Sequence, residues 1–376
     1  MLEIADAVRQ KKVSAKEVAS HYMNRIKTLD PKLNSFITVN DKALDEAALI
    51  DQRIAKGEDV GLFAGVPFGV KDMFCTKGLK TTAASKILGN FVPPYDSTVV
   101  ARLKKSGIVV MGKLNLDEFA MGSSNETSAF GGVKNPWNLD HVPGGSSGGS
   151  AAAQAARLVA GTVGTDTGGS IRQPASFCGI VGVKPTYGRV SRYGIVSYAS
   201  SLDQAGPMVS TVRDAAASLT VMSGRDERDS TTSEKEVPDF NKNLSSNVKG
   251  MKVGILKEYM AGGLDPDVQK TVEKSIEVLK KGGAEIIEVS VPLTEHAVPI
   301  YYLIATSEAS SNLARYDGVK YGYRAEFGAH GAEDLDAFYS KTRGEGFGKE
   351  VKRRIMLGTY CLSSGYYDAF YSKACQ

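Results

Sequence analysis

The segment from residue 142 to residue 175 is the feature that most restricts how this chain of 376 residues can fold. Two runs of glycine and serine, residues 143–150 and 164–170, flank an alanine-rich stretch with helical character. Glycine loses more conformational freedom on folding than any other residue, so paired glycines in ordered chain are kept where another group must approach the backbone. A flexible linker would not alternate such runs with a helix and an apolar strand. The segment therefore predicts a binding or catalytic site.

Short apolar runs that alternate with helical patterns indicate the fold class. Residues 65–70 and 107–111 have the composition of buried strands, and residues 97–105 between them have helical spacing. Strands that are apolar throughout and are separated by helices are typical of sheets covered on both faces. We therefore predict an α/β protein, with residues 1–60 as an N-terminal helical segment packed outside a larger domain of residues 61–376.

Helix signals are clear near both ends of the chain. Ser14 and Glu17 form a capping box, which predicts a helix that ends at residues 30–31. A second helix is expected over residues 43–54. The tyrosine-rich stretch of residues 297–376 is expected to be mostly helical.

A β–α–β unit is predicted in the second half of the chain. Residues 251–256 have the pattern of a strand, and Asp265 is placed to cap a helix whose first residue is a proline. This helix is expected to end at Lys281, before two glycines. Residues 284–291 then form the second strand of the unit.

The charge balance and the cysteine pattern exclude several classes of protein. A formal net charge of +4 is too small to bind nucleic acid by general electrostatic attraction. No apolar run approaches the roughly 18 residues of a membrane helix, and the N-terminus has no secretory leader, so we expect a cytoplasmic protein. The four cysteines have no paired spacing, which predicts free thiols rather than a zinc site or a disulfide framework.

Two motifs that would indicate other chemistry are incomplete. Residues 107–114 nearly match a phosphate-binding P-loop, but Leu114 stands where a serine or threonine would hold Mg²⁺. Residues 144–148 fit the GxSxG pattern of serine hydrolases, yet Pro143 and His141 precede them instead of an apolar strand. We therefore expect this chain to hold no cofactor and no metal of its own.

A serine nucleophile without a histidine needs another base. Lysine can serve when burial disfavours its charged form and lowers its pKa. Lys71 directly follows the apolar run of residues 65–70, which makes it the candidate. From the residues alone, a lysine after a strand is more often a solvated surface charge.

Three segments together resemble the amidase signature family: residues 69–72, residues 144–150 and residues 166–175. The resemblance extends over essentially the whole chain. It implies a large mixed central sheet covered by helices, within a catalytic domain over residues 61–376. Members of this family continue beyond the position of Gln376, so we expect the C-terminal part of the family domain to be missing.

The family resemblance also implies roles for individual residues. Ser170 would be the nucleophile, Lys71 the base, and Ser146 the serine that bridges them and follows a cis peptide bond. Attack on a carboxamide would release ammonia and leave an acyl ester, which water hydrolyses. The backbone N–H groups that would bind the oxyanion belong to Thr167, Gly168, Gly169 and Ser170.

Four further segments are similar to one branch of this family, the glutamine-hydrolysing A subunits of tRNA-dependent amidotransferases: residues 115–122, 184–192, 200–204 and 345–355. This branch implies that ammonia from glutamine converts Glu-tRNA(Gln) to Gln-tRNA(Gln), Asp-tRNA(Asn) to Asn-tRNA(Asn), or both. It also implies a heterotrimer with B and C subunits, in which misacylated tRNA binds mainly through the B subunit. ATP and Mg²⁺ would be used at the partner subunit.

A glutamine site needs a cation for the α-carboxylate of the substrate. The family position points to Arg354, with Tyr301 beside it, while Lys352 and Arg353 remain alternatives because a basic cluster on a helix is more often a solvated face. The other pocket residues expected from the resemblance are Met121 and Gly122.

Two other functions stay open at this point. A stand-alone amidase of small carboxamides would keep Lys71, Ser146 and Ser170 but would not need Arg354. A non-enzymatic subunit would use its glycines only for packing within a complex.

Overall fold

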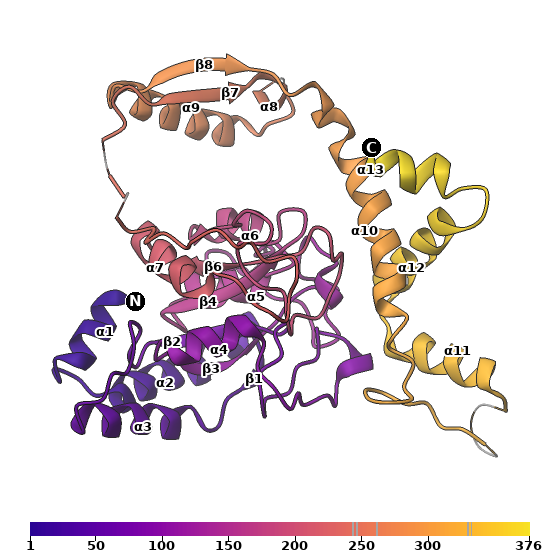
Figure 1. The fold of residues 1–376 in the computed structure, drawn as a ribbon, viewed down its shortest axis with the longest axis horizontal. Coiled ribbons are helices and arrows are strands. Elements are labelled where there is room, and N and C mark those ends of the chain that lie inside the picture. Colours follow the sequence, from indigo (N-terminus) through magenta and orange to yellow (C-terminus); the bar gives the residue numbers. More distant parts are fainter. Residues whose placement is uncertain (243, 246, 261, 329–330, 332) are drawn as a thin grey trace.

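A six-stranded mixed sheet runs through the centre of the computed structural model, which describes residues 1–376 except 243, 246, 261, 329, 330 and 332 (Figure 1). The strand order is β1-β3-β2-β4-β6-β5. Strand β2 is parallel to both β3 and β4, whereas β1, β5 and β6 run antiparallel to their neighbours. The predicted α/β class with a mixed central sheet is confirmed. The strands are β1 (Phe36–Val39), β2 (Pro67–Lys71), β3 (Val109–Leu114), β4 (Gly161–Asp166), β5 (Val181–Gly182) and β6 (Gln204–Val209).

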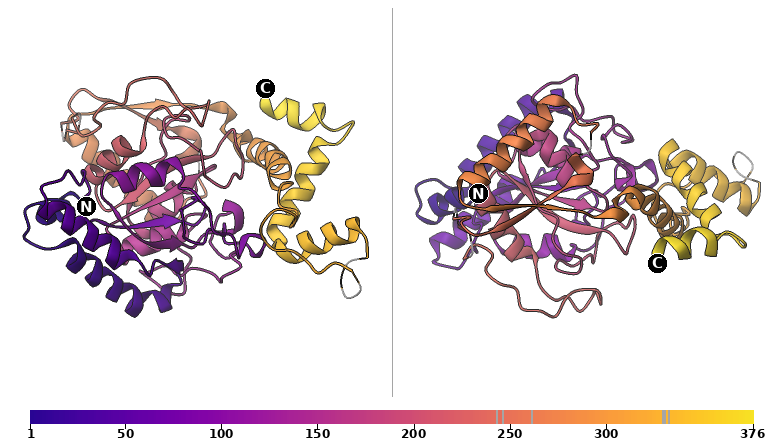
Figure 2. Two further views of the ribbon diagram at one scale, coloured as in Figure 1. Left: turned by 60° about the horizontal axis from the view of Figure 1, so that its bottom comes forward. Right: turned by 90° about the horizontal axis from the view of Figure 1, so that it is seen from above.

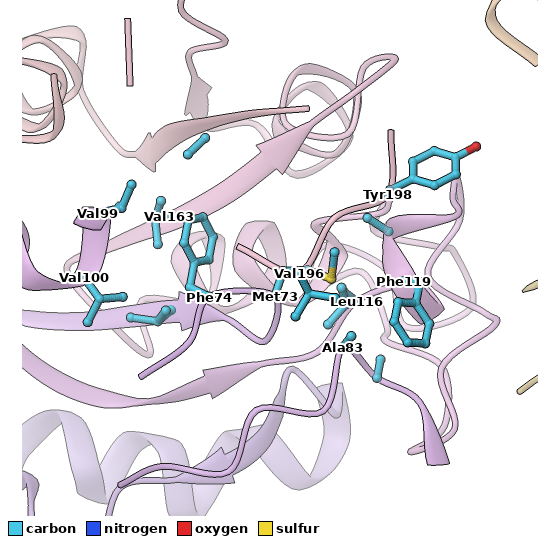
Figure 3. Close-up of a cluster of buried hydrophobic side chains, with 14 of the residues drawn as sticks. Met73, Phe74, Ala83, Val99, Val100, Leu116, Phe119, Val163, Val196 and Tyr198 are labelled. Atoms are coloured by element: carbon cyan, nitrogen blue, oxygen red, sulfur yellow. The ribbon is translucent and has the colours of Figure 1, made fainter. Parts of the chain in front are cut away.

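Helices cover both faces of this sheet because its strands alternate their side chains between two apolar clusters. Val109 and Met111 of β3 pack with helices α2, α3 and α5. Val110, between them, packs on the opposite face with Phe68 of β2 and with helices α4 and α7. Figure 3 shows part of this second cluster, with Val99 and Val100 of α4 near Val163 of β4. The helices are α1 (Leu2–Arg9), α2 (Ala15–Leu33), α3 (Ala43–Ala55), α4 (Thr98–Lys105), α5 (Gly148–Ala155), α6 (Arg172–Cys178) and α7 (Val212–Met222).

Helix α2 shows where a local signal succeeds and where it fails. The predicted capping box is present, with Glu17 N donating to Ser14 Oγ at 3.1 Å and Ser14 N donating to Glu17 Oε2 at 2.9 Å. The predicted end at residues 30–31 is wrong, because Pro31 lies inside the last turn of the helix. A proline there removes only one backbone hydrogen bond, and Asn34 in the left-handed conformation ends the helix instead. The boundary drawn at residue 60 stays a prediction.

The predicted β–α–β unit is confirmed, but it lies apart from the central sheet. Strands β7 (Lys252–Leu256) and β8 (Glu285–Val289) form a separate parallel pair, with α8 (Lys257–Met260) and α9 (Pro266–Lys281) between them in sequence. Figure 1 shows this pair as a separate layer beyond the central sheet. Asp265 caps α9 as predicted, by accepting a hydrogen bond from Asp267 N at 2.9 Å. No residue of α9 is buried.

The C-terminal helices lie together at one side of the central sheet (Figure 2). Helices α10 (Ala297–Leu313) and α12 (Lys349–Leu362) cross so closely that a Cβ added at Gly358 would lie 1.9 Å from the carbonyl oxygen of Thr306. Among the described residues, no helix is both long and apolar enough to cross a membrane. The remaining elements are η1 (Lys86–Leu88), η2 (Glu118–Ala120), η3 (Pro292–His296), α11 (Leu335–Gly346), η4 (Asp368–Ser372) and α13 (Lys373–Cys375).

The crossing of α10 and α12 can be tested with a matched pair of substitutions. Gly358→Ala should lower the free energy of unfolding by about 1–3 kcal/mol, because the new methyl group meets backbone that cannot yield. Gly344→Ala in α11 should raise it by up to about 1 kcal/mol, because a Cβ there meets no atom within 4 Å and alanine favours helix. Urea unfolding of both variants measures the difference. Equal effects of the two changes would contradict the close crossing.

Candidate active site

Lys71 is the last residue of β2, and its side chain is fully buried. Its Nζ atom lies 2.8 Å from each of three hydroxyl oxygens, those of Ser146, Ser147 and Thr165. The alternative of a solvated surface lysine is therefore wrong. The buried amine directly contacts Ser146, one of the two serines in the glycine–serine runs.

Burial also sets the proton affinity of this amine. Removal from water lowers the pKa of Lys71 to about 7, although the carboxylates of Asp117, Asp166 and Asp203 act in the opposite direction. A pKa near 7 leaves a large fraction of Lys71 uncharged at neutral pH. The uncharged amine can accept a proton from the hydroxyl of Ser146.

Ser146 lies in the turn that leads into α5. The peptide bond between Gly145 and Ser146 is cis, as the family resemblance predicts. A side chain at Gly145 has no room, because a Cβ there would lie 2.1 Å from Asp117 Oδ2. The N–H of Gly145 donates to Gln173 Oε1 at 2.9 Å, which joins this turn to the start of α6. The glycine is thus required by close packing around the serine.

Ser170 lies in the loop between β4 and α6, and Asp166 at the end of β4 holds this loop. Asp166 accepts hydrogen bonds from Gly169 N at 2.8 Å and Ile171 N at 3.1 Å. Arg172 Nε donates to the same carboxylate at 3.0 Å. Burial alone would raise the pKa of Asp166, but these hydrogen bonds outweigh it and the pKa is lowered. The carboxylate stays ionised and fixes the loop.

The structure brings Ser170 to an open cavity. The cavity has a volume of about 290 Å³, and Ser170 shares its wall with Gly122, Gly145, Gly168 and Tyr301. Within the described part of the chain, the Ser170 hydroxyl has no hydrogen-bond partner, so no direct bond joins it to Ser146 in this structure. The predicted relay from Lys71 is therefore assembled as far as Ser146.

The backbone amides near Ser170 are not equivalent. The N–H of Gly169 is occupied by Asp166, whereas those of Gly168 and Ser170 have no hydrogen-bond partner among the described residues. Thr167 donates its hydroxyl to Asp203 at 2.6 Å, which fixes the first residue of the loop. The oxyanion hole predicted from all four amides stays a prediction, and in this structure the Gly169 amide is committed elsewhere.

Some of the predicted pocket residues line the cavity, whereas another lies in the hydrophobic core. Gly122 and Tyr301 line the cavity, and the Tyr301 ring packs on Gly168, where an added Cβ would lie 2.7 Å from the ring. Met121 instead lies in the hydrophobic core, where it is 1% exposed. Met121 is not among the residues that line this cavity, so its contact with substrate stays a prediction.

Of the three basic candidates on α12, only Arg354 is turned toward the cavity wall. Its guanidinium donates to Gly122 O at 2.8 Å, Tyr198 Oη at 3.0 Å and Glu350 Oε1 at 2.7 Å. Arg353 is exposed and pairs with Glu350, and Lys352 donates to Gly344 O at the surface. Arg354 is not itself part of the cavity wall; it supports that wall through Gly122.

Several site residues were not predicted from sequence. Ser147 and Thr165 complete the hydroxyl set around Lys71, and both lie inside the glycine–serine segment that the sequence marks as a site. Asp117 was expected only as part of a family segment, and nothing local indicates that its carboxylate lies behind Gly145. The structure also leaves all four cysteines as free thiols, as predicted.

The sequence matches the Amidase family over residues 17–376. The chain belongs to the amidase family. The A subunit of the glutamyl-tRNA(Gln) amidotransferase of Bdellovibrio bacteriovorus is 74% identical over 374 residues, which are 100% of this chain and 76% of that protein. The protein of the same name from Geobacter metallireducens is 58% identical over 373 residues, 99% of this chain and 76% of that protein.

Solved structures of amidase family members share the fold. The A subunit of the glutamyl-tRNA(Gln) amidotransferase of Thermotoga maritima has a TM-score of 0.76 and 44% identity, and the match covers 96% of this chain and 70% of that one. The peptide amidase of Stenotrophomonas maltophilia has a TM-score of 0.83 and 32% identity, with coverage of 99% and 77%. The family resemblance stated from the motifs is confirmed.

The lowered pKa of Lys71 predicts how the reactivity of Ser170 depends on pH. The rate of Ser170 labelling by phenylmethanesulfonyl fluoride should rise about tenfold per pH unit below pH 7 and level off above it, because only the uncharged amine accepts a proton. Lys71→Met should lower the rate by about a hundredfold or more and remove this pH dependence. Mass spectrometry of the labelled protein measures both. A wild-type rate that is flat between pH 6 and pH 8 would contradict the role of Lys71 as base.

Proposed function

We propose that this amidase-family chain hydrolyses glutamine as the A subunit of a tRNA-dependent amidotransferase and supplies the ammonia to a partner. The observation that carries the proposal is the buried Lys71 amine bound to Ser146, beside a cavity that exposes Ser170. It occurs in a chain that is 74% identical to the A subunit of a glutamyl-tRNA(Gln) amidotransferase.

The proposed reaction proceeds in two halves. Uncharged Lys71 takes the proton of Ser146, which in turn takes the proton of Ser170 as the Ser170 oxygen attacks the carboxamide carbon. The C–N bond then breaks, the proton returns to the leaving nitrogen, and ammonia departs. Water attacks the acyl ester by the reverse proton path and releases glutamate and free Ser170. Of the four amides predicted for the oxyanion, we assign this role to those of Thr167, Gly168 and Ser170, because the Gly169 amide donates to Asp166.

Glutamine recognition is proposed to depend on the α12 side of the cavity. An arginine has five N–H donors, and Arg354 uses three of them within the described structure. Arg354 lies behind Gly122 of the cavity wall in this structure, so we assign its two remaining donors to the α-carboxylate of a bound glutamine on the condition that the wall at Gly122 and Tyr301 opens when the substrate enters. The buried guanidinium stays charged, because nearby Tyr198 and Glu350 outweigh the effect of burial and raise the pKa of Arg354.

The proposal extends to partners and cofactors. We assign B and C subunits as the partners of this chain in a cytoplasmic heterotrimer, with misacylated tRNA bound mainly by the B subunit. ATP and Mg²⁺ are assigned to the partner subunit, because amide formation on a carboxylate requires activation that a Ser-Ser-Lys site does not provide.

A stand-alone amidase of small carboxamides is the less supported alternative. It shares Lys71, Ser146 and Ser170 with the proposed function. The identity to the two amidotransferase proteins, 74% and 58%, is well above the 32% to the peptide amidase. A requirement for Arg354 would distinguish the two functions, because a simple carboxamide has no carboxylate for Arg354 to bind.

Ammonia release from glutamine tests the proposal directly. The chain, co-purified with candidate B and C subunits, should release ammonia from glutamine, and more rapidly with misacylated tRNA and ATP present. Ser170→Ala should abolish this release, whereas Arg354→Ala should raise KM for glutamine by about tenfold or more, the cost of one charged hydrogen-bond pair. Glutamine turnover that survives Ser170→Ala, or an Arg354→Ala variant with unchanged kinetics, would contradict the assignment.

A further inference from the structure

Glu118 is a buried carboxylate that the proposed reaction does not use. It is 1% exposed, and its two oxygens lie 3.1 Å and 2.9 Å from the N–H of Gly348, which donates to them. The hydroxyl of Ser85 also donates to this carboxylate. Gly348 is the N-cap of α12. Glu118 therefore binds the start of the helix that carries Arg354.

The start of a helix favours a negative charge. The first backbone N–H groups of a helix have no partner within it, and the helix dipole is positive at this end. Burial raises the pKa of Glu118, while the hydrogen bonds from Ser85 and Gly348 oppose this shift. The contact is so close that a Cβ added at Gly348 would lie 2.2 Å from Glu118 Oε2.

A second bond joins α12 to the same short segment of chain. Arg354 donates to the carbonyl of Gly122 at 2.8 Å, and Gly122 lies four residues after Glu118. Gly122 lines the cavity and packs on the catalytic turn, since a Cβ there would lie 2.9 Å from Ser146 N. Helix α12 is thus held to the cavity wall at two points, its start and its second turn.

Helix α12 in turn supports the tyrosines of the cavity. It crosses α10 closely at Gly358, and α10 supplies Tyr301 and Tyr302 to the cavity wall. The guanidinium of Arg354 lies 5.4 Å from the centre of the Tyr302 ring. A shift at the start of α12 would therefore move the arginine and the tyrosines together relative to Ser170.

We propose that Glu118 is a positioning residue, which fixes the start of α12 against the cavity wall and thereby holds Arg354 and Tyr301 in place for glutamine. The proposal rests on the proposed function, because it concerns the recognition of glutamine and not the chemistry at Ser170. The proposal therefore predicts different effects of a Glu118 substitution on glutamine and on simple amides. A substrate without an α-carboxylate does not need the part of the wall that Glu118 holds. The junction keeps an apolar contact when Glu118 is changed, since the rings of Phe119 and Phe347 lie 5.6 Å apart there.

The test compares glutamine with butanamide, a substrate without carboxylate or amino group, in the assembly that hydrolyses glutamine. Glu118→Ala should raise KM for glutamine by at least about tenfold while kcat changes by less than about threefold. The kcat/KM for butanamide should stay within about twofold of wild type. Glu118→Gln, which keeps an oxygen acceptor for Gly348 N–H, should restore KM to within about threefold of wild type.

Hydrogen exchange supplies a measurement that does not depend on activity. Amides of residues 346–354 should exchange faster in Glu118→Ala, while those of residues 161–171 should not change. Glu17→Ala is the matched control, because Glu17 likewise accepts from a backbone N–H at the start of a helix, 2.9 Å from Ser14 N. It should alter neither KM nor exchange over residues 346–354.

The outcomes separate positioning from general stability. Unchanged KM and unchanged exchange in Glu118→Ala would overturn the proposal, as would an equal loss of kcat on glutamine and butanamide. If Glu118→Ala does not fold, Gly348→Ala displaces the same contact without removing the buried carboxylate, and the same two measurements decide. A wild-type protein without glutamine hydrolysis would overturn the proposed function, and the exchange experiment would then still decide whether Glu118 holds α12.

Discussion

The site depends on one buried amine that has hydroxyl groups, and no carboxylate, as its direct partners. Among the described residues, Lys71 contacts three hydroxyls at 2.8 Å and forms no ion pair. An ammonium ion in a dry interior without a paired anion is costly, so the uncharged form becomes accessible near neutral pH. Hydroxyls satisfy the hydrogen bonds of both forms of the amine. The position can therefore exchange a proton without leaving a buried polar group unsatisfied.

The carboxylates around this amine are kept close but are bound elsewhere. Asp166 accepts hydrogen bonds from the nucleophile loop and from Arg172, and Asp203 accepts from Thr167 and from two backbone amides. Asp117 holds the Asn125 and Thr127 turn behind Gly145. Each carboxylate thus fixes a backbone segment near Lys71 and accepts its hydrogen bonds from groups other than the Lys71 amine. A direct carboxylate contact would hold the amine charged and remove the base.

The parts of this structure that the sequence predicts are those set by local rules. The capping box at Ser14 and the limits of α9 follow from neighbouring residues, and both are correct. The glycine–serine segment marks the site because glycines such as Gly145 have no room for a side chain. The close approach of Asp117 to Gly145, by contrast, depends on the path that the chain takes between β3 and β4, which no local sequence pattern indicates. The separation of β7 and β8 from the central sheet depends on tertiary packing, and no local pattern carries it. The resemblance to a family supplied the roles of Ser146 and Ser170, which spacing alone left open.

Different elements of the fold carry the reacting groups and form the substrate-facing wall of the cavity. Lys71 ends β2, Ser146 lies in the turn before α5, and Ser170 lies in the loop between β4 and α6, so the amine and both serines are carried by the central sheet and the segments that adjoin it. The substrate-facing wall comes from α10, with α12 behind it. These helices meet the core through buried apolar side chains such as Leu313 and Val351, and also through polar bonds such as Arg354 to Gly122 and Glu308 to Ser201. The proton path and the substrate-facing wall therefore come from different elements of this fold: Lys71 ends β2, whereas Tyr301 and Tyr302 belong to α10.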